Sequence, residues 1–222
     1  KGQRELLTIG KLLVMIATLS ENFLKRFGVE TTYFNPMDLA GIKQHFRPNS
    51  KAIYVEAPGS HTFEVMDVSA VAGAAQDAGI KVVMDNTWSA GYYFKPFAFG
   101  VDVSVQAATK YHVGHSDAML GAITVLNNNL EPVAESVRQL GHHAAPDDAY
   151  LGLRGMRTMA VRLKRHYSNG LKLAEWLAGE SCRQDIMFGH LHNGVVGVLG
   201  DVSERVDSPV LLVDGSGLGV NL

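Results

Sequence analysis

The sequence predicts an α/β protein in which a mostly parallel β-sheet lies between helices. Short runs rich in β-branched and aromatic residues alternate with stretches of helical composition, which is the pattern of strands joined by helical connections. Most positions in these runs are apolar, as expected for strands covered on both faces. A chain of 222 residues, 46% hydrophobic and 19% charged, is long enough for one full domain with a sizeable core.

Five strands are predicted from these runs. The first ends at Asn35-Pro36 and the second at Pro58-Gly59-Ser60, because these turn residues interrupt the β-type pattern. The predicted strands cover residues 29–34, 51–56, 80–85, 102–106 and 122–126. Two further β-like runs, at 193–200 and 210–213, have few helical partners.

Three helices are predicted along the chain. A helix end over residues 21–27 is closed by Gly28, and a helix over 68–78 stops at Gly79, because glycine adopts the left-handed conformation that ends helices. The longest helix covers about residues 147–177 and starts with Pro146 and two acids, as the helix dipole favours. Its basic residues are interpreted as a solvated or inter-helix face.

Composition excludes several classes of protein. The net charge is −2, without a long basic run, so no nucleic-acid surface is predicted. The single cysteine, Cys182, cannot form an internal disulfide, which favours a reducing cytoplasm. The apolar stretch over 6–19 is interrupted by Lys11 and is too short to span a membrane, so it is interpreted as buried or misfitting structure. Because the first residue is Lys1, we expect a processed chain or a piece of a longer one.

Candidate chemistry lies at two predicted strand ends. Asp85 ends one strand and Lys110 follows another, and the carboxyl ends of parallel strands share the crevice where ligands bind. An amine and a carboxylate together suit pyridoxal phosphate, whose aldehyde forms a Schiff base and whose ring nitrogen is held protonated. On spacing alone, a loop cap and a surface charge are the commoner outcome, because these residue types are mostly exposed.

The sequence motifs around these two residues are much more specific evidence than their spacing. It comprises D-N-T-W at 85–88, F-G-x-D-V-S-x-Q at 99–106 and A-A-T-K-Y-x-V-G-H-S-D at 107–117, with E-A-P-G-S at 56–60, D-D-A-Y at 147–150 and R-G-M-R-T at 154–158. Over about residues 20–179 the sequence resembles the Cys/Met-metabolism family of pyridoxal-phosphate-dependent enzymes, the trans-sulfuration group.

The resemblance implies a fold and a division of the chain. The implied fold is the large cofactor domain of the aspartate aminotransferase type, truncated at both ends. Residues 1–19 form a divergent N-terminal segment, 20–179 the cofactor-binding core, and 180–222 a divergent tail without the family's small domain. The family's phosphate loop, ring-stacking tyrosine, N-terminal arm and carboxylate-binding arginine find no match in the two end segments.

Five site residues follow from the resemblance. Lys110 resembles the lysine that forms the Schiff base, and Asp85 the partner of the pyridinium nitrogen. Thr109 resembles a phosphate contact. Ala107 stands where many relatives have a hydroxyl residue, so its contact is through the backbone. Tyr150 resembles a tyrosine on the substrate side.

The resemblance also implies a reaction. Ala107 is similar to the β-lyase branch rather than the γ-synthase branch, which implies a carbon-sulfur lyase of methionine biosynthesis that eliminates homocysteine from cystathionine and releases pyruvate and ammonia. The implied partners are an amino-acid thioether and further copies of the chain, as a dimer or tetramer, without nucleic acid or membrane. Two alternatives stay open: a catalytically silent fragment that at most pairs subunits, and a γ-synthase or γ-lyase activity.

Other motifs are weaker. The run from Gly114 to Ala118 nearly spells a hydrolase elbow, but it lacks the last glycine, and adjacent His, Ser and Asp cannot converge on one another. Three histidine pairs have no metal-ligand partner at a recognisable spacing, so no metal is predicted; they are His112 and His115, His142 and His143, and His190 and His192. The glycine-rich stretch over 213–219 is interpreted as a flexible tail rather than a phosphate loop.

Overall fold

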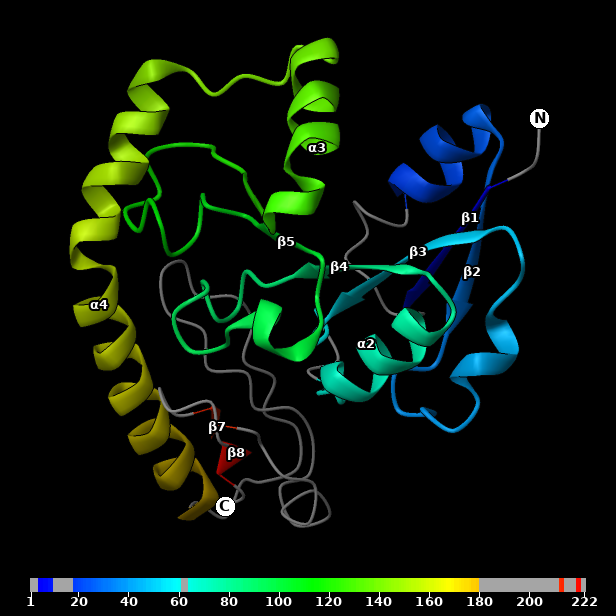
Figure 1. The fold of residues 1–222 in the computed structure, drawn as a ribbon. Helices are drawn as coiled ribbons and strands as arrows, with labels where there is room; N and C mark the ends of the chain where they lie inside the picture. The colour runs from blue at the N-terminus through cyan, green and yellow to red at the C-terminus, as the bar shows by residue number, and fades with distance from the viewer. Residues whose placement is uncertain (1–3, 10–17, 61–63, 180–211, 214–218, 221–222) are drawn as a thin grey trace.

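A six-stranded sheet forms the centre of the computed structural model, which describes residues 4–9, 18–60, 64–179, 212–213 and 219–220 (Figure 1). The strand order is β2-β1-β3-β4-β5-β6. The first five strands in this order are parallel, and β6 is antiparallel to β5. The strands are β1 (Arg4–Ile9), β2 (Val29–Phe34), β3 (Ser50–Glu56), β4 (Lys81–Asp85), β5 (Val103–Gln106) and β6 (Ala122–Val125).

The predicted α/β class with a mostly parallel sheet is confirmed, and each of the five predicted strands is present within one residue at either end. β1 is not predicted from the sequence. It lies between β2 and β3, with Leu7 opposite both Thr32 and Ile53. Its residues begin a long apolar run in which no alternation marks a strand, so pairing on both sides identifies it where local pattern does not.

Among the described residues, three α-helices accompany the sheet, namely α2 (Val68–Asp77), α3 (Asn127–Gln139) and α4 (Pro146–Gly179). The predictions for α2 and α4 are confirmed, whereas α3 is not predicted. The predicted helix end at 21–27 consists of a π-helical turn, Leu19–Phe23, and a 3-10 turn, Leu24–Phe27, ending at Gly28 with φ 73°.

Helix α2 covers one face of the sheet and completes the main core. Asp67 caps its start, because the carboxylate accepts a hydrogen bond from the Ala70 N–H at 2.9 Å. Gly79, with φ 68°, ends it and turns the chain into β4. The fully buried side chains of this core are Ile53, Val55, Val71, Ala72, Ala75, Val82, Met84 and Val101.

Helix α4 runs along the side of the molecule opposite to β1 and β2 (Figure 1). It packs through Leu163 against a second buried cluster that includes Ala90 and Tyr111. These two residues belong to the loops that follow β4 and β5, so α4 supports the loops at the carboxyl ends of the strands rather than the strands themselves.

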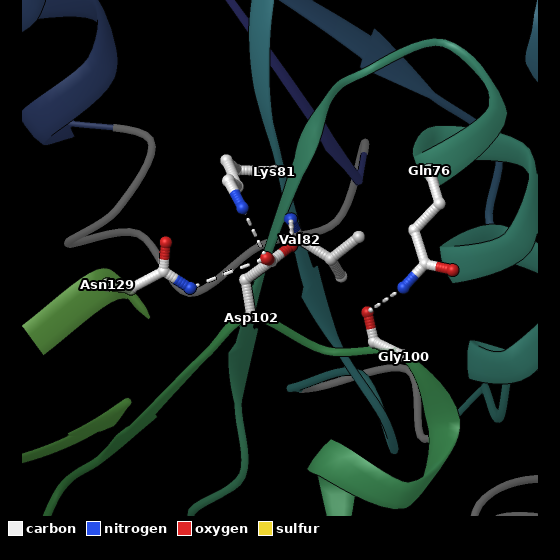
Figure 2. Close-up of polar contacts among 6 residues, drawn as sticks. All are labelled: Gln76, Lys81, Val82, Gly100, Asp102 and Asn129. Carbon is white, nitrogen blue, oxygen red and sulfur yellow. Dashed lines mark hydrogen bonds and ion pairs between the residues drawn. The ribbon is translucent and has the colours of Figure 1, made fainter. Parts of the chain in front are cut away.

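The amino ends of β4 and β5 are joined by one carboxylate, that of Asp102 (Figure 2). Its oxygens accept hydrogen bonds from the Val82 N–H at 2.9 Å and the Lys81 ammonium at 2.7 Å, with a longer contact of 3.5 Å from the Asn129 amide. Burial opposes ionisation of Asp102, but the donors from Lys81 and Val82 outweigh it and lower the pKa of this carboxyl. Asp102 of the F-G-x-D motif therefore stabilises the sheet.

Several predictions fall outside the described residues. They are the thiol of Cys182, the histidines His190 and His192, and the β-like run at 193–200. Within the described part of 210–222, β7 (Leu212–Val213) pairs with β8 (Gly219–Val220) in an antiparallel ribbon. Among the helices described, none combines the length and the apolar character that crossing a membrane requires.

Candidate active site

The carboxyl ends of β4 and β5 are tied together at Asp85. This residue ends β4 and lies opposite Val105 of β5. The Thr87 N–H donates a hydrogen bond to the Asp85 carboxylate at 2.9 Å, and the Thr87 hydroxyl oxygen accepts one from the Ala107 N–H at 2.7 Å. Thr87 therefore fixes both the carboxylate at the end of β4 and the backbone that leaves β5.

Lys110 is carried by a tight turn that starts at Ala107. The Lys110 N–H donates to the Ala107 carbonyl at 2.9 Å, and the Lys110 carbonyl accepts from the Gly114 N–H at 2.8 Å. The Lys110 side chain is exposed, and its ammonium group has no hydrogen-bond or ion-pair partner in the part of the chain that is described. The backbone is thus held while the amine stays available.

A second carboxyl adjoins Asp85. Glu56 ends β3 directly opposite Asp85 in the parallel register, so the two side chains share one face of the sheet. Glu56 is only 4% exposed, and it accepts hydrogen bonds from the Ser60 hydroxyl at 2.5 Å and from the Trp88 side chain. Burial, together with the charge of Asp85, raises the pKa of Glu56 despite these donors.

Tyr54 completes this acidic cluster. It lies two positions before Glu56 on β3, and its hydroxyl is hydrogen-bonded to the Asp85 side chain. Burial raises the pKa of the Tyr54 hydroxyl, and the charges of Asp85 and Glu56 raise it further. The phenol therefore keeps its proton and acts as a donor to the Asp85 carboxylate.

The other three predicted site residues have different surroundings. The Thr109 hydroxyl donates to the Leu120 carbonyl at 3.2 Å and accepts from the Leu120 N–H at 2.8 Å. The Ala107 N–H is bonded to Thr87. Tyr150 lies near the start of α4 with 64% of its surface exposed. The structure thus brings Asp85, Ala107 and the Lys110 turn to one sheet edge, and Thr109 joins that turn to the segment before β6.

Sequence reasoning missed Thr87, Tyr54 and Glu56 as neighbours of the predicted pair. Glu56 carries a signal that could have found it, because it ends one predicted strand as Asp85 ends the next. Thr87 and Tyr54 carry no such signal, because their contacts depend on the register between strands and on the path of the loop after β4.

The rival motifs form no second site among the described residues. In the nearly hydrolase-like run, Asp117 pairs with Arg154 at 2.8 Å, whereas the His115 ring contacts the Val113 carbonyl, so no relay joins the two. The described residues contain no group of three or more side chains arranged to hold a metal ion.

A model of the Cys/Met metabolism PLP-dependent enzymes matches residues 4–194 of the sequence. The chain belongs to this family. The match extends beyond residues 20–179, over which the resemblance was expected, and it begins with β1. Pyridoxal phosphate is the cofactor on which enzymes of this family depend.

Two relatives within the family carry the name cystathionine beta-lyase. The chain is 48% identical to a putative cystathionine beta-lyase of Rhizobium johnstonii over 159 residues, which are 72% of this chain and 40% of that protein. It is 45% identical to the cystathionine beta-lyase of Escherichia coli over 157 residues, 70% of this chain and 40% of that protein. This chain therefore spans about 40% of the length of these curated relatives.

A solved structure agrees with the fold. Cystathionine gamma-lyase from Lactobacillus plantarum, complexed with L-serine, superposes with a TM-score of 0.79 at 29% sequence identity. The likeness covers 82% of this chain and 48% of that protein. The fold of this chain therefore corresponds to about half of that solved structure.

Proposed function

We propose that this chain contains the cofactor-binding core of a carbon-sulfur lyase that cleaves cystathionine. The observation that carries the proposal is the edge of the sheet where Asp85 ends β4 and the Lys110 turn leaves β5, joined through Thr87. The names of the relatives at 48% and 45% identity support the β-lyase reaction over others in the family. The resemblance supports a cytoplasmic homo-oligomer, either a dimer or a tetramer.

The donor groups at this edge fit pyridoxal phosphate. Lys110 offers an amine without a partner among the described residues, which an aldehyde requires. Asp85 offers a carboxylate held in place by the Thr87 N–H and the Tyr54 hydroxyl, which suits a protonated ring nitrogen. When bound, the cofactor supplies an electron sink for the charge that develops at the substrate Cα.

The chain's own groups then have distinct tasks. Lys110 holds the cofactor and takes the proton from the substrate Cα as a general base. Asp85 keeps the negative charge that stabilises the protonated ring nitrogen, and Tyr54 orients that carboxylate. The Cα–H and Cβ–S bonds break, the sulfur leaves as a thiolate that gains a proton, and water completes the conversion of cystathionine to homocysteine, pyruvate and ammonia.

Thr109, Ala107 and Tyr150 have subsidiary proposed roles. Thr109 and the Ala107 backbone are proposed as phosphate contacts, because they stand in the family motif. Their donors are bonded to Leu120 and Thr87 respectively, so phosphate binding would exchange these partners for phosphate oxygens. Tyr150 is proposed as a substrate-side residue because of its place in the D-D-A-Y motif.

A second candidate function is a non-catalytic module that pairs with a longer relative. One observation favours it: α4 exposes large apolar side chains on successive turns. These are Tyr150, Leu153, Met156 and Val161, each at least 50% exposed.

One experiment separates the two candidates. Pyridoxal phosphate is added to the chain, absorbance is recorded at about 400–450 nm, where the lysine-bound cofactor absorbs, and pyruvate release from cystathionine is measured. The lyase proposal predicts a band and pyruvate in the wild type, and loss of both in Lys110→Ala. Lys164→Ala, an exposed lysine on α4, is the matched control and keeps both. A wild type with neither signal favours the pairing module.

A further inference from the structure

A half-buried arginine on α4 is bonded to the turn that carries Lys110. The Nη2 atom of Arg162 donates hydrogen bonds to the carbonyl oxygens of Tyr111 at 2.7 Å and Gly155 at 2.8 Å. Its Nε atom donates to the hydroxyl oxygen of Thr158 at 3.1 Å. The guanidinium group therefore joins one turn of α4 to the carbonyl of the residue that directly follows Lys110.

Two glycines make room for this contact. Gly114 has φ 76°, and a Cβ atom at this position would overlap the guanidinium group of Arg162. On α4, a Cβ atom at Gly155 would overlap the carbonyl oxygens of His112 and Val113. Glycine inside a helix is destabilising relative to alanine, so Gly155 marks a place where close approach of α4 to this turn outweighs helix propensity.

The charge of Arg162 is directed at neutral carbonyl groups. Among the described residues it forms no ion pair with a carboxylate, and its Nη1 atom is buried without a partner. Burial and the neighbouring guanidinium both lower the pKa of His112 and of His166, so these two rings add no charge near neutral pH. A charged donor bonds a carbonyl oxygen more strongly than a neutral donor does.

We infer that Arg162 is a positioning residue for Lys110. This inference rests on the proposed function, in which the Lys110 amine attaches the cofactor and moves the substrate proton. The Lys110 turn is held on one side by its own bonds to Ala107 and Gly114. On its other side it is held by Arg162 through Tyr111. Loss of this second anchor lets the amine shift relative to Asp85.

Arginine suits this task better than lysine. Its planar group directs Nη2 and Nε in fixed directions, here toward two carbonyl oxygens and the Thr158 hydroxyl. Lysine is a point charge on a flexible stem. Arg162→Lys therefore keeps the charge and removes the geometry. Thr158→Val is a milder variant, because it keeps the guanidinium group and removes the hydroxyl that accepts from Nε and donates to the Gly155 carbonyl at 3.2 Å.

The test compares the whole chain in four forms: wild type, Arg162→Lys, Thr158→Val and Arg165→Lys. Arg165 is exposed on α4 and serves as the matched control. Four quantities are measured: the rate at which the visible band of lysine-bound pyridoxal phosphate appears, kcat for cystathionine, KM for cystathionine, and the thermal midpoint of the unloaded chain. The first of these does not depend on turnover.

Arg162→Lys is expected to lower the rate of cofactor attachment and kcat by about 10-fold to 100-fold, because a misplacement of about 1 Å costs on that order. KM should stay within about twofold, since the substrate contacts are intact. Thr158→Val should lower the same two rates by about threefold, and Arg165→Lys should match the wild type.

The outcomes are separable. A folded Arg162→Lys variant whose attachment rate and kcat match those of Arg165→Lys overturns the inference. If Arg162→Lys does not fold, a Thr158→Val variant with wild-type attachment rate and kcat overturns it. A wild type that never develops the visible band contradicts the proposed function itself, and this inference falls with it.

Discussion

Asp85 and Asp102 lie at opposite ends of the same two neighbouring strands, and their carboxylates have different surroundings. Asp102, before β5, accepts a backbone N–H of β4 and an ammonium group. Asp85, at the end of β4, accepts the Thr87 N–H and the Tyr54 hydroxyl, and it lies opposite the buried carboxyl of Glu56.

The difference separates a structural carboxylate from one suited to a ligand. A cation from the chain itself compensates the charge of Asp102, and the pKa of Asp102 is lowered. No cation pairs with Asp85 in the described residues, and a second acid lies beside it. An acid placed against another acid costs stability unless a ligand or a proton offsets the repulsion. A protonated ring nitrogen is such a ligand.

The largest effect is expected from Asp85→Asn. The amide cannot stabilise a protonated ring nitrogen by charge, so turnover of cystathionine should fall about 100-fold to 1000-fold, as when a preorganised electrostatic partner is removed. The free energy of unfolding should not fall, because the repulsion from Glu56 disappears. Pyruvate release and urea unfolding measure the two quantities. Turnover within about fivefold of the wild type would remove Asp85 from the proposed site.

Asp102→Asn should lower stability and leave turnover unchanged, the reverse of Asp85→Asn. Its amide cannot pair with the Lys81 ammonium, and its NH₂ group would compete with the Val82 N–H, so the free energy of unfolding should fall by about 1–3 kcal/mol. Turnover per folded molecule should be unchanged. Asp77→Asn is the control, because the Asp77 carboxylate is 73% exposed in its pair with Lys43. Equal stability of the two variants would contradict a structural role for Asp102.

The stability contributed at the two ends of these strands should also change with pH in opposite directions. Asp102 has a folded pKa below its ordinary 3.8, so its stabilising effect is present above that pH and is lost as the pH falls through the folded value. Glu56 has a folded pKa above its ordinary 4.5. The stability that the protonated Glu56 carboxyl contributes is therefore fully present below that pH and is lost as the pH rises through the folded value.

Urea unfolding across this pH range tests the signs with one variant for each end. Glu56→Gln should flatten the decline of stability above about pH 4.5, and Asp102→Asn should flatten the decline below about pH 4. A Glu56→Gln profile parallel to that of the wild type on the alkaline side would show that Glu56 ionises as freely in the folded state as in the unfolded chain.

The smallest effect is expected from Lys81→Met. The Lys81 side chain is 53% exposed, and solvent screens its pair with Asp102. The free energy of unfolding should therefore fall by less than about 1 kcal/mol. A loss as large as that of Asp102→Asn would mean that the ion pair, rather than the hydrogen bond from the Val82 N–H, carries the stabilisation.

The sequence predicts the strands around both aspartates because local patterns end at clear turn residues. The proposal of Asp85 and Lys110 as site residues comes from the sequence, since Asp85 ends one predicted strand, Lys110 follows another, and the motifs around them resemble the family. The positions of Glu56 and Tyr54 beside Asp85 could not, because they depend on the register of β3 against β4. β1 was missed for a similar reason, since its identity comes from pairing with β2 and β3.

The attachment point of the cofactor tests the central claim most directly. The chain is loaded with pyridoxal phosphate and reduced with borohydride, which makes the bond between lysine and cofactor permanent. The chain is then digested, and the modified peptide is identified by mass spectrometry. If the carboxyl ends of β4 and β5 form the site, the reduced cofactor is found on Lys110 and on no other lysine in comparable yield. Two results would contradict the account: modification of a different lysine, or a yield of modified peptide in the wild type no higher than in Lys110→Ala.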